Sequence, residues 1–253
     1  MWSIRVIGAY IHKPVMLGNT MRRVAKPSAP KRAPAKPRRP SPRRAPAERP
    51  YHHGDLRRVL VDAAFELVGE GGAEGLSVRE AARRAGVSPG APFRHFASRE
   101  ALLAAVAEEA QRRLGVEVER TLAKAPADDP LQRFRAVGIA YMRWATRNPT
   151  HFEVISSRRL FDHGKSAVVT SGNAEVIGLT ERLLKEAHAS GQLGTSDLKQ
   201  VLIAARALVY GFARMAIDGH FPRWGVAAAE VDRTAEGILD LFLSGIARRA
   251  GHS

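Results

Sequence analysis

The stretch GLSVREAARRAGVSPGAPFRHFASREALL, residues 75–103, has the pattern of two short helices joined by a tight turn. The first helix has an apolar stripe at helical spacing, formed by Val78, Ala81, Ala82 and Ala85. Ser77 is a good N-cap, and Glu80 completes an S-x-x-E capping box by reaching back to the Ser77 backbone N–H. Gly86 ends the helix because the next position often needs a left-handed conformation. The pattern predicts a helix-turn-helix.

The second helix is predicted over residues 89–95, with Ser88 as N-cap and Pro89 at the first helical position. Its outward side chains are small at the start and basic at the end, while Phe93 and Phe96 can anchor it from behind. Small residues permit close approach to base edges, and Arg94 can grip a phosphate or make a bidentate contact to guanine. This helix is therefore predicted to contact DNA.

Residues 51–110 resemble the DNA-binding domain of the TetR family of bacterial transcriptional regulators. The resemblance includes a helix from Asp55, the turn GVSPGAPFRHF and the continuation ASREALLAAVA. It implies that Pro89, Gly90, Ala91, Phe93 and Arg94 face the groove edge. It also implies that Ser77, Arg79, His95 and Arg99 lie where contacts to the DNA backbone are expected. Helix pairs with a glycine turn also occur in bundles that do not bind DNA.

The positive charge of the chain is unevenly distributed. Of the 253 residues, the first fifty hold 13 basic residues and one acidic residue, so they carry +12 of the total charge of +15. The remaining 203 residues carry +3, so their DNA affinity must come from a local basic surface. The candidates are Arg79, Arg83, Arg84, Arg94 and Arg99.

Residues 1–50 are predicted to be a disordered basic, Pro-rich tail, because residues 21–50 have almost no large apolar side chain to bury. The tail could add phosphate contacts or enter a minor groove. The run at residues 6–11 is too short for a secretory signal, and residues 1–20 could be upstream of a true start at Met16 or Met21.

Several other classes of protein lack support in the sequence. With no cysteine, disulfides and thiolate sites are excluded, and the nine histidines show no metal-ligand spacing. No catalytic or nucleotide-binding motif is present, so no enzyme activity and no cofactor are predicted. No segment approaches 18 consecutive apolar residues, so the protein is predicted to be cytoplasmic and nucleoid-associated, without a membrane span.

Beyond residue 110 the pattern remains helical, with predicted helices over residues 131–148, 149–161, 173–189, 197–218 and 227–250. The predicted fold class is all-α. A three-helix helix-turn-helix domain (51–97) precedes a helical ligand-binding and dimerisation domain (98–253), for about nine helices.

The last two helices are more apolar than a single packing face requires, which predicts a homodimer that reads a palindromic DNA operator. The alternative is a wholly intramolecular core. The candidate interface residues, which the family's final helix pair also implies, are Gly211, Gly237, Ile238, Phe242 and Gly245.

The run RAVGIAYMRWATRNPTHF, residues 135–152, is similar to a common C-terminal domain of the family, in which aromatic residues line a cavity. A small apolar or aromatic effector is therefore expected there, although residues at helical spacing are often plain core. The candidates are Tyr141, Met142, Trp144, His151, Phe152, Phe161, Arg206 and Tyr210.

The sequence thus predicts a ligand-responsive DNA-binding transcriptional regulator, in the form of a repressor that a small molecule releases from its operator. The alternative is a non-specific nucleoid-type or RNA-binding protein that acts through the basic tail, with affinity independent of nucleic-acid sequence.

Overall fold

The computed structural model describes residues 53–157, 160, 164 and 166–248. Within these ranges the chain forms α-helices and short 3-10 helices, with no strand beyond an isolated bridge between Leu193 and Ala247. The all-α class is confirmed. The predicted tail of residues 1–50 lies outside the described residues. The α-helices are α1 (His53–Gly71), α2 (Val78–Arg84), α3 (Arg99–Leu122), α4 (Pro130–Arg147), α5 (Pro149–Ser156), α6 (Ala167–Ala189), α7 (Leu198–Ile217) and α8 (Val231–Ile246).

Helix α2 begins and ends as the sequence predicts. The Ser77 hydroxyl oxygen accepts the Glu80 backbone N–H at 3.1 Å, and Gly86 has a φ of +67°. The second half of the capping box is different, because the Glu80 carboxylate accepts two bonds from the Arg83 guanidinium. The buried stripe of α2 packs on α1 and seats the helix in the core.

The segment after the turn is a correction to the sequence prediction. In place of an α-helix over residues 89–95, the chain forms a 3-10 helix, η1 (Ala91–Arg94), with Gly90 as its N-cap. The Ala91 N–H donates to Ser88 at 3.1 Å, and the His95 N–H donates to Pro92 at 2.8 Å. The run SPGAP places two prolines and a glycine within five residues, and proline offers no N–H for an α-helical bond.

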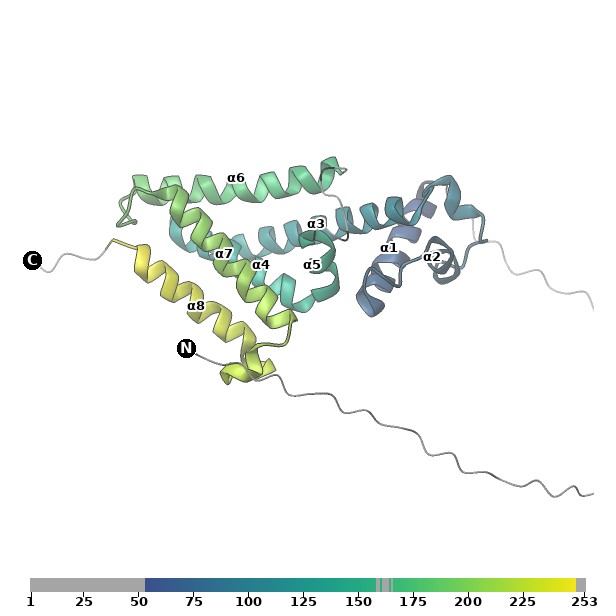
Figure 1. Cartoon of the computed structure of the whole chain (residues 1–253). Coiled ribbons are helices and arrows are strands. Elements are labelled where there is room, and N and C mark those ends of the chain that lie inside the picture. Colours follow the sequence, from purple (N-terminus) through teal and green to yellow (C-terminus); the bar gives the residue numbers. More distant parts are fainter. Residues whose placement is uncertain (1–52, 158–159, 161–163, 165, 249–253) are drawn as a thin grey trace, which may run out of the picture. The chain divides into compact units, whose positions relative to one another are not determined.

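Helix α4 lies among α3, α6, α7 and α8 (Figure 1). Asp129 caps its start, where its carboxylate accepts the Gln132 N–H at 3.0 Å. Gly138 lets α8 approach, because a Cβ at this position would lie 3.0 Å from a methyl carbon of Leu239. The inward side chains of α4 are buried on several sides, so this helix is the centre of the core.

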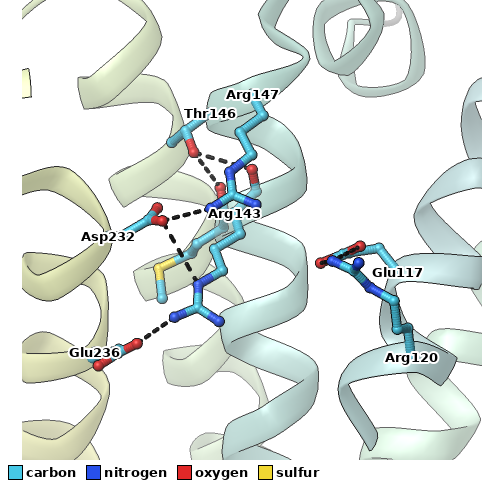
Figure 2. A network of polar contacts seen from close by, with 8 residues as sticks. Glu117, Arg120, Arg143, Thr146, Arg147, Asp232 and Glu236 are labelled. Carbon is cyan, nitrogen blue, oxygen red and sulfur yellow. Dashed lines mark hydrogen bonds and ion pairs between the residues drawn. The ribbon is translucent and has the colours of Figure 1, made fainter. Parts of the chain in front are cut away.

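A ladder of ion pairs fixes α8 along α4 (Figure 2). Arg147 donates to Asp232 at 2.6 Å, and Arg143 donates to Glu236. One turn further on α8, Asp240 accepts two bonds from Arg135 at 2.5 and 3.0 Å. Acidic residues at four-residue spacing therefore meet arginines that lie along one face of α4.

Four predicted helix boundaries, in three helices, were wrong. Helix α5 ends at Ser156 rather than at Phe161, which lies outside the described residues. Helix α8 begins at Val231, after a 3-10 turn, and ends at Ile246. Helix α6 begins at Ala167, well before the predicted start, because the Ser166 hydroxyl caps it by accepting the Val169 N–H.

Gly172 shows why the start of α6 was misplaced. The helix was predicted to begin at residue 173, immediately after this glycine, yet Gly172 lies inside α6 against α3. A Cβ here would lie 2.6 Å from Cγ of the buried Gln111. The glycine therefore serves close packing between two helices.

Gly172→Ala should destabilise the protein by about 1–3 kcal/mol, because the added methyl group overpacks the contact with Gln111. The matched control is Gly178→Ala in the same helix, where the Cβ meets only the Arg182 guanidinium at 3.6 Å. That control should stabilise by about 0.5–1 kcal/mol, the usual gain of alanine over glycine in a helix. Urea unfolding measures both. Equal free energies of unfolding for the two variants would contradict the packing role of Gly172.

Candidate nucleic-acid interface and ligand cavity

The segment after the helix-turn-helix turn presents an exposed surface held by two buried anchors. Pro92 and Phe96 are buried, whereas Phe93 is 49 % exposed and does not anchor the segment as predicted. Gly90 and Arg94 are also exposed. The predicted outward residues that are exposed are Pro89, Gly90, Phe93, Arg94 and His95, and Ala91 is half-buried.

Four of the five basic candidates fall into two groups. Arg83 pairs with Glu80 at 2.6 Å and Arg84 with Glu70 at 2.6 Å, so both charges are locally compensated. Each pair lowers the pKa of its carboxyl group through hydrogen bonds from the guanidinium. Arg79 and Arg94 make no hydrogen bond or ion pair with any residue that the structure describes. Of the five candidates, these two arginines carry charges that no described residue compensates.

Arg99 has a structural role that the sequence analysis missed. Its guanidinium donates to the backbone carbonyls of Leu76 at 3.0 Å and Ala73 at 2.6 Å. These bonds tie the start of α3 to the loop between α1 and α2. Arg99 is therefore a positioning residue for the helix-turn-helix, and its contact with DNA stays a prediction.

The Arg57 guanidinium of α1 lies 5.4 Å from the ring centroid of Phe96. Arg57 is exposed, and the contact places a positive charge behind the outward segment. Sequence reasoning missed it because no local pattern pairs a residue of α1 with one after η1.

A junction between α1, α3 and α5 is built on Phe65. The imidazole of His151 stacks on the Phe65 ring, with centroids 3.6 Å apart, and its Nε2–H donates to the Phe65 carbonyl at 2.8 Å. Arg113 lies over the same ring at 3.9 Å, on the face that His151 leaves free. Gly69 leaves space for the imidazole, since a Cβ there would lie 3.2 Å from His151 Cε1. Burial lowers the pKa of His151.

A cavity of about 620 Å³ lies between α3, α4, α6, α7 and α8. This volume is in the range of small-molecule sites, roughly 300–1,000 Å³. The lining is almost wholly apolar. Its residues are Leu114, Val118, Phe134, Val137, Gly138, Tyr141, Val176, Ile177, Thr180, Leu202, Ile203, Ala205, Arg206, Ala207, Val209, Tyr210 and Leu239.

Three of the predicted ligand residues line this cavity, namely Tyr141, Arg206 and Tyr210. Phe152 lies behind them, with ring centroids 5.7 Å from Tyr141 and 5.9 Å from Tyr210. Met142, Trp144 and His151 are buried core residues outside the lining, and their contact with a ligand stays a prediction that the cavity does not support. The remaining candidate, Phe161, lies outside the described residues.

Sequence reasoning missed the contributions of α3, α6 and α8 to the cavity. Val176 and Thr180 lie one turn apart on α6 and line the cavity. The only feature of the sequence that pointed to them was the apolar stripe of this helix. Amphipathic periodicity identifies a packing face but does not reveal where packing is incomplete.

An apolar surface on α7 and α8 is left open. Leu241 is 74 % exposed, while Ile238 and Phe242 beside it are half-buried. A Cβ at Gly237 or Gly245 would meet no described neighbour within 4 Å, so neither glycine serves close packing against the described part of the chain. The same holds for the half-buried Gly211 of α7.

Helix α7 is long and apolar enough to cross a membrane by length and composition, with a mean hydropathy of 1.4. Only 28 % of the relevant window is buried. The helix packs on α4, α6 and α8, so part of its apolar surface belongs to the core.

Comparison with known proteins identifies both halves of the described chain. Residues 60–106 match the model of bacterial regulatory proteins of the tetR family, and residues 134–242 match that of the tetracyclin repressor-like C-terminal domain. The chain belongs to the TetR family. The resemblance that the helix-turn-helix sequence predicted is therefore confirmed.

Among TetR-family relatives, the HTH-type transcriptional regulator BetI of Yersinia pestis is 36 % identical over 81 residues. The match covers 32 % of this chain and 41 % of BetI, so the chain spans less than half the length of the curated relatives it matches.

A solved structure from Rhodococcus sp. RHA1, described as a protein with unknown function, is 34 % identical to this chain. It covers 79 % of this chain and 100 % of its own, with a TM-score of 0.67. The ketosteroid transcriptional regulator KstR2 of Mycobacterium tuberculosis shares the fold at 18 % identity, with a TM-score of 0.58 over 77 % of this chain and 96 % of its own.

The junction at Phe65 yields a pH prediction for this TetR-family chain. The pKa of His151 is lower in the folded state than in the unfolded state. As the pH decreases through about 6.5, the unfolded chain therefore binds more protons than the folded chain does. The free energy of unfolding should therefore decrease between about pH 7.5 and about pH 5.5, and His151→Gln should show a smaller decrease. Urea unfolding at both pH values measures the difference.

The control is His188→Gln, at an exposed position of α6. It should keep the decrease found for the parent chain. A decrease in His151→Gln as large as in the parent would show that protonation of His151 does not affect folding.

Proposed function

We propose that the protein is a homodimeric, ligand-responsive DNA-binding transcriptional regulator that represses its target genes. One observation carries this proposal, namely that the same chain holds two separate features. The first is an exposed helix-turn-helix segment with two uncompensated arginines, and the second is an apolar cavity of about 620 Å³. Family membership supports the DNA-binding part. The target, chromosomal DNA, implies a cytoplasmic, nucleoid-associated protein, and no enzymatic step is proposed.

On DNA, the outward surface from Gly90 to His95 enters the major groove. Gly90 has no side chain to hold the backbone away from base edges, and Arg94 reaches the acceptors of guanine. Arg79 lies on the exposed face of α2 and contacts phosphate. Two such surfaces in a two-fold dimer match half-sites about 34–36 Å apart, and the operator is therefore palindromic.

The dimer forms through α7 and α8. Leu241 and its flanking glycines supply an apolar surface that no described residue of the same chain covers. The low burial of α7 supports the same location. Burial of this surface against a second copy removes apolar area from water and stabilises the pair.

Ligand release works through α4. Tyr141 of α4 lines the cavity, and the same helix leads through Asn148 and Pro149 directly into α5. His151 of α5 holds Phe65 of α1. A ligand that displaces α4 therefore changes how α1 is held. The ligand favours the released conformer over the DNA-bound conformer only as far as it binds the released one more tightly. A tenfold ratio of the two affinities supplies about 1.4 kcal/mol.

Arg94→Ala should weaken binding to the operator by roughly 1–3 kcal/mol per half-site and relax preference at one base pair. Arg79→Ala should weaken operator and random DNA alike, because a phosphate contact carries no base information. Operator duplexes selected in vitro by the parent protein, with shuffled duplexes at equal salt, provide the measurement. The control is Arg120→Ala on α3, whose partner is Glu117 (Figure 2). Equal losses on both DNAs for Arg94→Ala would remove Arg94 from base reading.

Leu241→Glu should convert the dimer into a monomer that keeps its helical content, because it places a charge in a desolvated contact. Light scattering measures mass, and circular dichroism measures helicity. The matched control is Val116→Glu on α3, also an exposed apolar position at 50 %. It should remain dimeric. A Leu241→Glu protein that stays dimeric would contradict an interface on this face of α8.

A further inference from the structure

Among the described residues that line the cavity, Arg206 of α7 is the one charged residue and none is a carboxylate. Arg206 makes no hydrogen bond or ion pair with a residue that the structure describes. Its recorded contact is with the ring of Tyr141, whose centroid lies 5.5 Å from the guanidinium carbon. By contrast, Arg214, two turns further on α7, pairs with Asp218 at 2.7 Å. Arg206 is exposed, so solvent reaches its charge, and no described residue compensates that charge at the edge of the apolar cavity.

A second polar group lies beside it. Tyr141 is only 8 % exposed and lines the cavity, yet its hydroxyl makes no hydrogen bond with a described residue. Burial raises the pKa of Tyr141 to about 12, so at neutral pH the hydroxyl keeps its proton and can donate it. Thr180, also in the lining, already donates to backbone carbonyls of its own helix.

The polar end of the cavity therefore offers hydrogen-bond donors and a positive charge. The guanidinium only donates, and the Tyr141 hydroxyl, which has no hydrogen-bond partner among the described residues, can donate to a group inside the cavity. A neutral ligand would gain nothing from the charge of the exposed Arg206, and a cationic ligand would be repelled by it. An anionic group accepts from both side chains, since arginine matches a carboxylate with two parallel bonds.

Resting on the ligand site proposed above, we propose that the effector is an amphipathic anion. Its apolar chain or ring fills the space between α4, α6 and α7, and its single carboxylate binds the Arg206 guanidinium and the Tyr141 hydroxyl. The apolar body supplies most of the buried area, and the carboxylate supplies the orientation. Charge recognition by Arg206 then separates acids from alcohols and amines of the same carbon skeleton.

The test uses the full chain and two matched sets of probes below their micelle concentrations. One set is dodecanoate, 1-dodecanol and dodecylamine, and the other is 2-naphthoate and 2-naphthol. Isothermal titration calorimetry measures affinity. The carboxylate of at least one set should bind at least about tenfold more tightly than its neutral member, and dodecylamine should bind most weakly.

Arg206→Met keeps an apolar stem of similar length without the charge, so it should bind acid and alcohol within about threefold of each other. Arg206→Lys should restore part of the preference, and Tyr141→Phe should reduce it while the cavity stays open. Arg214→Met is the matched control on the same helix, outside the lining, and should behave as the parent chain does.

Two results would overturn the inference while leaving the ligand site intact. One is equal binding of the acid and the neutral member in every set that binds. The other is an unchanged acid preference in Arg206→Met. Binding of none of the five probes would contradict the proposed apolar ligand site itself, and the anion inference would fall with it.

Discussion

The burial of α4 among four other helices is the interaction on which the remaining features depend. Its inward side chains, including Phe134, Met142 and Trp144, are each worth about 1.5–3 kcal/mol when buried. The ion-pair ladder to α8 is partly exposed, and such pairs contribute only about 0–1 kcal/mol each. Apolar burial therefore supplies most of the stability, whereas the arginines and acids determine how α8 is aligned along α4.

The same helix links the cavity to the helix-turn-helix domain. Tyr141 faces the cavity, and the following helix α5 places His151 against Phe65 of α1. A buried aromatic stack with a backbone hydrogen bond is a specific contact, so small displacements of α5 alter how α1 is supported. Cores are close-packed and transmit strain, which makes this short route from cavity to helix-turn-helix physically direct.

Most of the candidate arginines of the helix-turn-helix domain bond to other groups of the same chain. Arg83 and Arg84 satisfy nearby carboxylates and Arg99 holds the loop before α2, which leaves Arg79 and Arg94 unpaired among the described residues. A helix-turn-helix must be rigid to present its outward segment in register. The hydrogen bonds of these arginines make the domain more rigid, because each bond fixes a neighbouring element.

Local chemistry explains why the sequence by itself determined the helix-turn-helix, the all-α class and most helix boundaries. Ser77, Gly86, Ser98 and Asp129 act within a few residues of their own position, and caps and turns depend on short-range bonds. The tertiary structure alone decided the 3-10 form of η1, the extension of α6 across Gly172 and the lining of the cavity. It also decided that Tyr141 lines the cavity while Met142, Trp144 and His151 are buried outside the lining. All four lie on apolar stretches, but only contacts between helices distant in sequence decide which of them meets empty space and which meets another side chain.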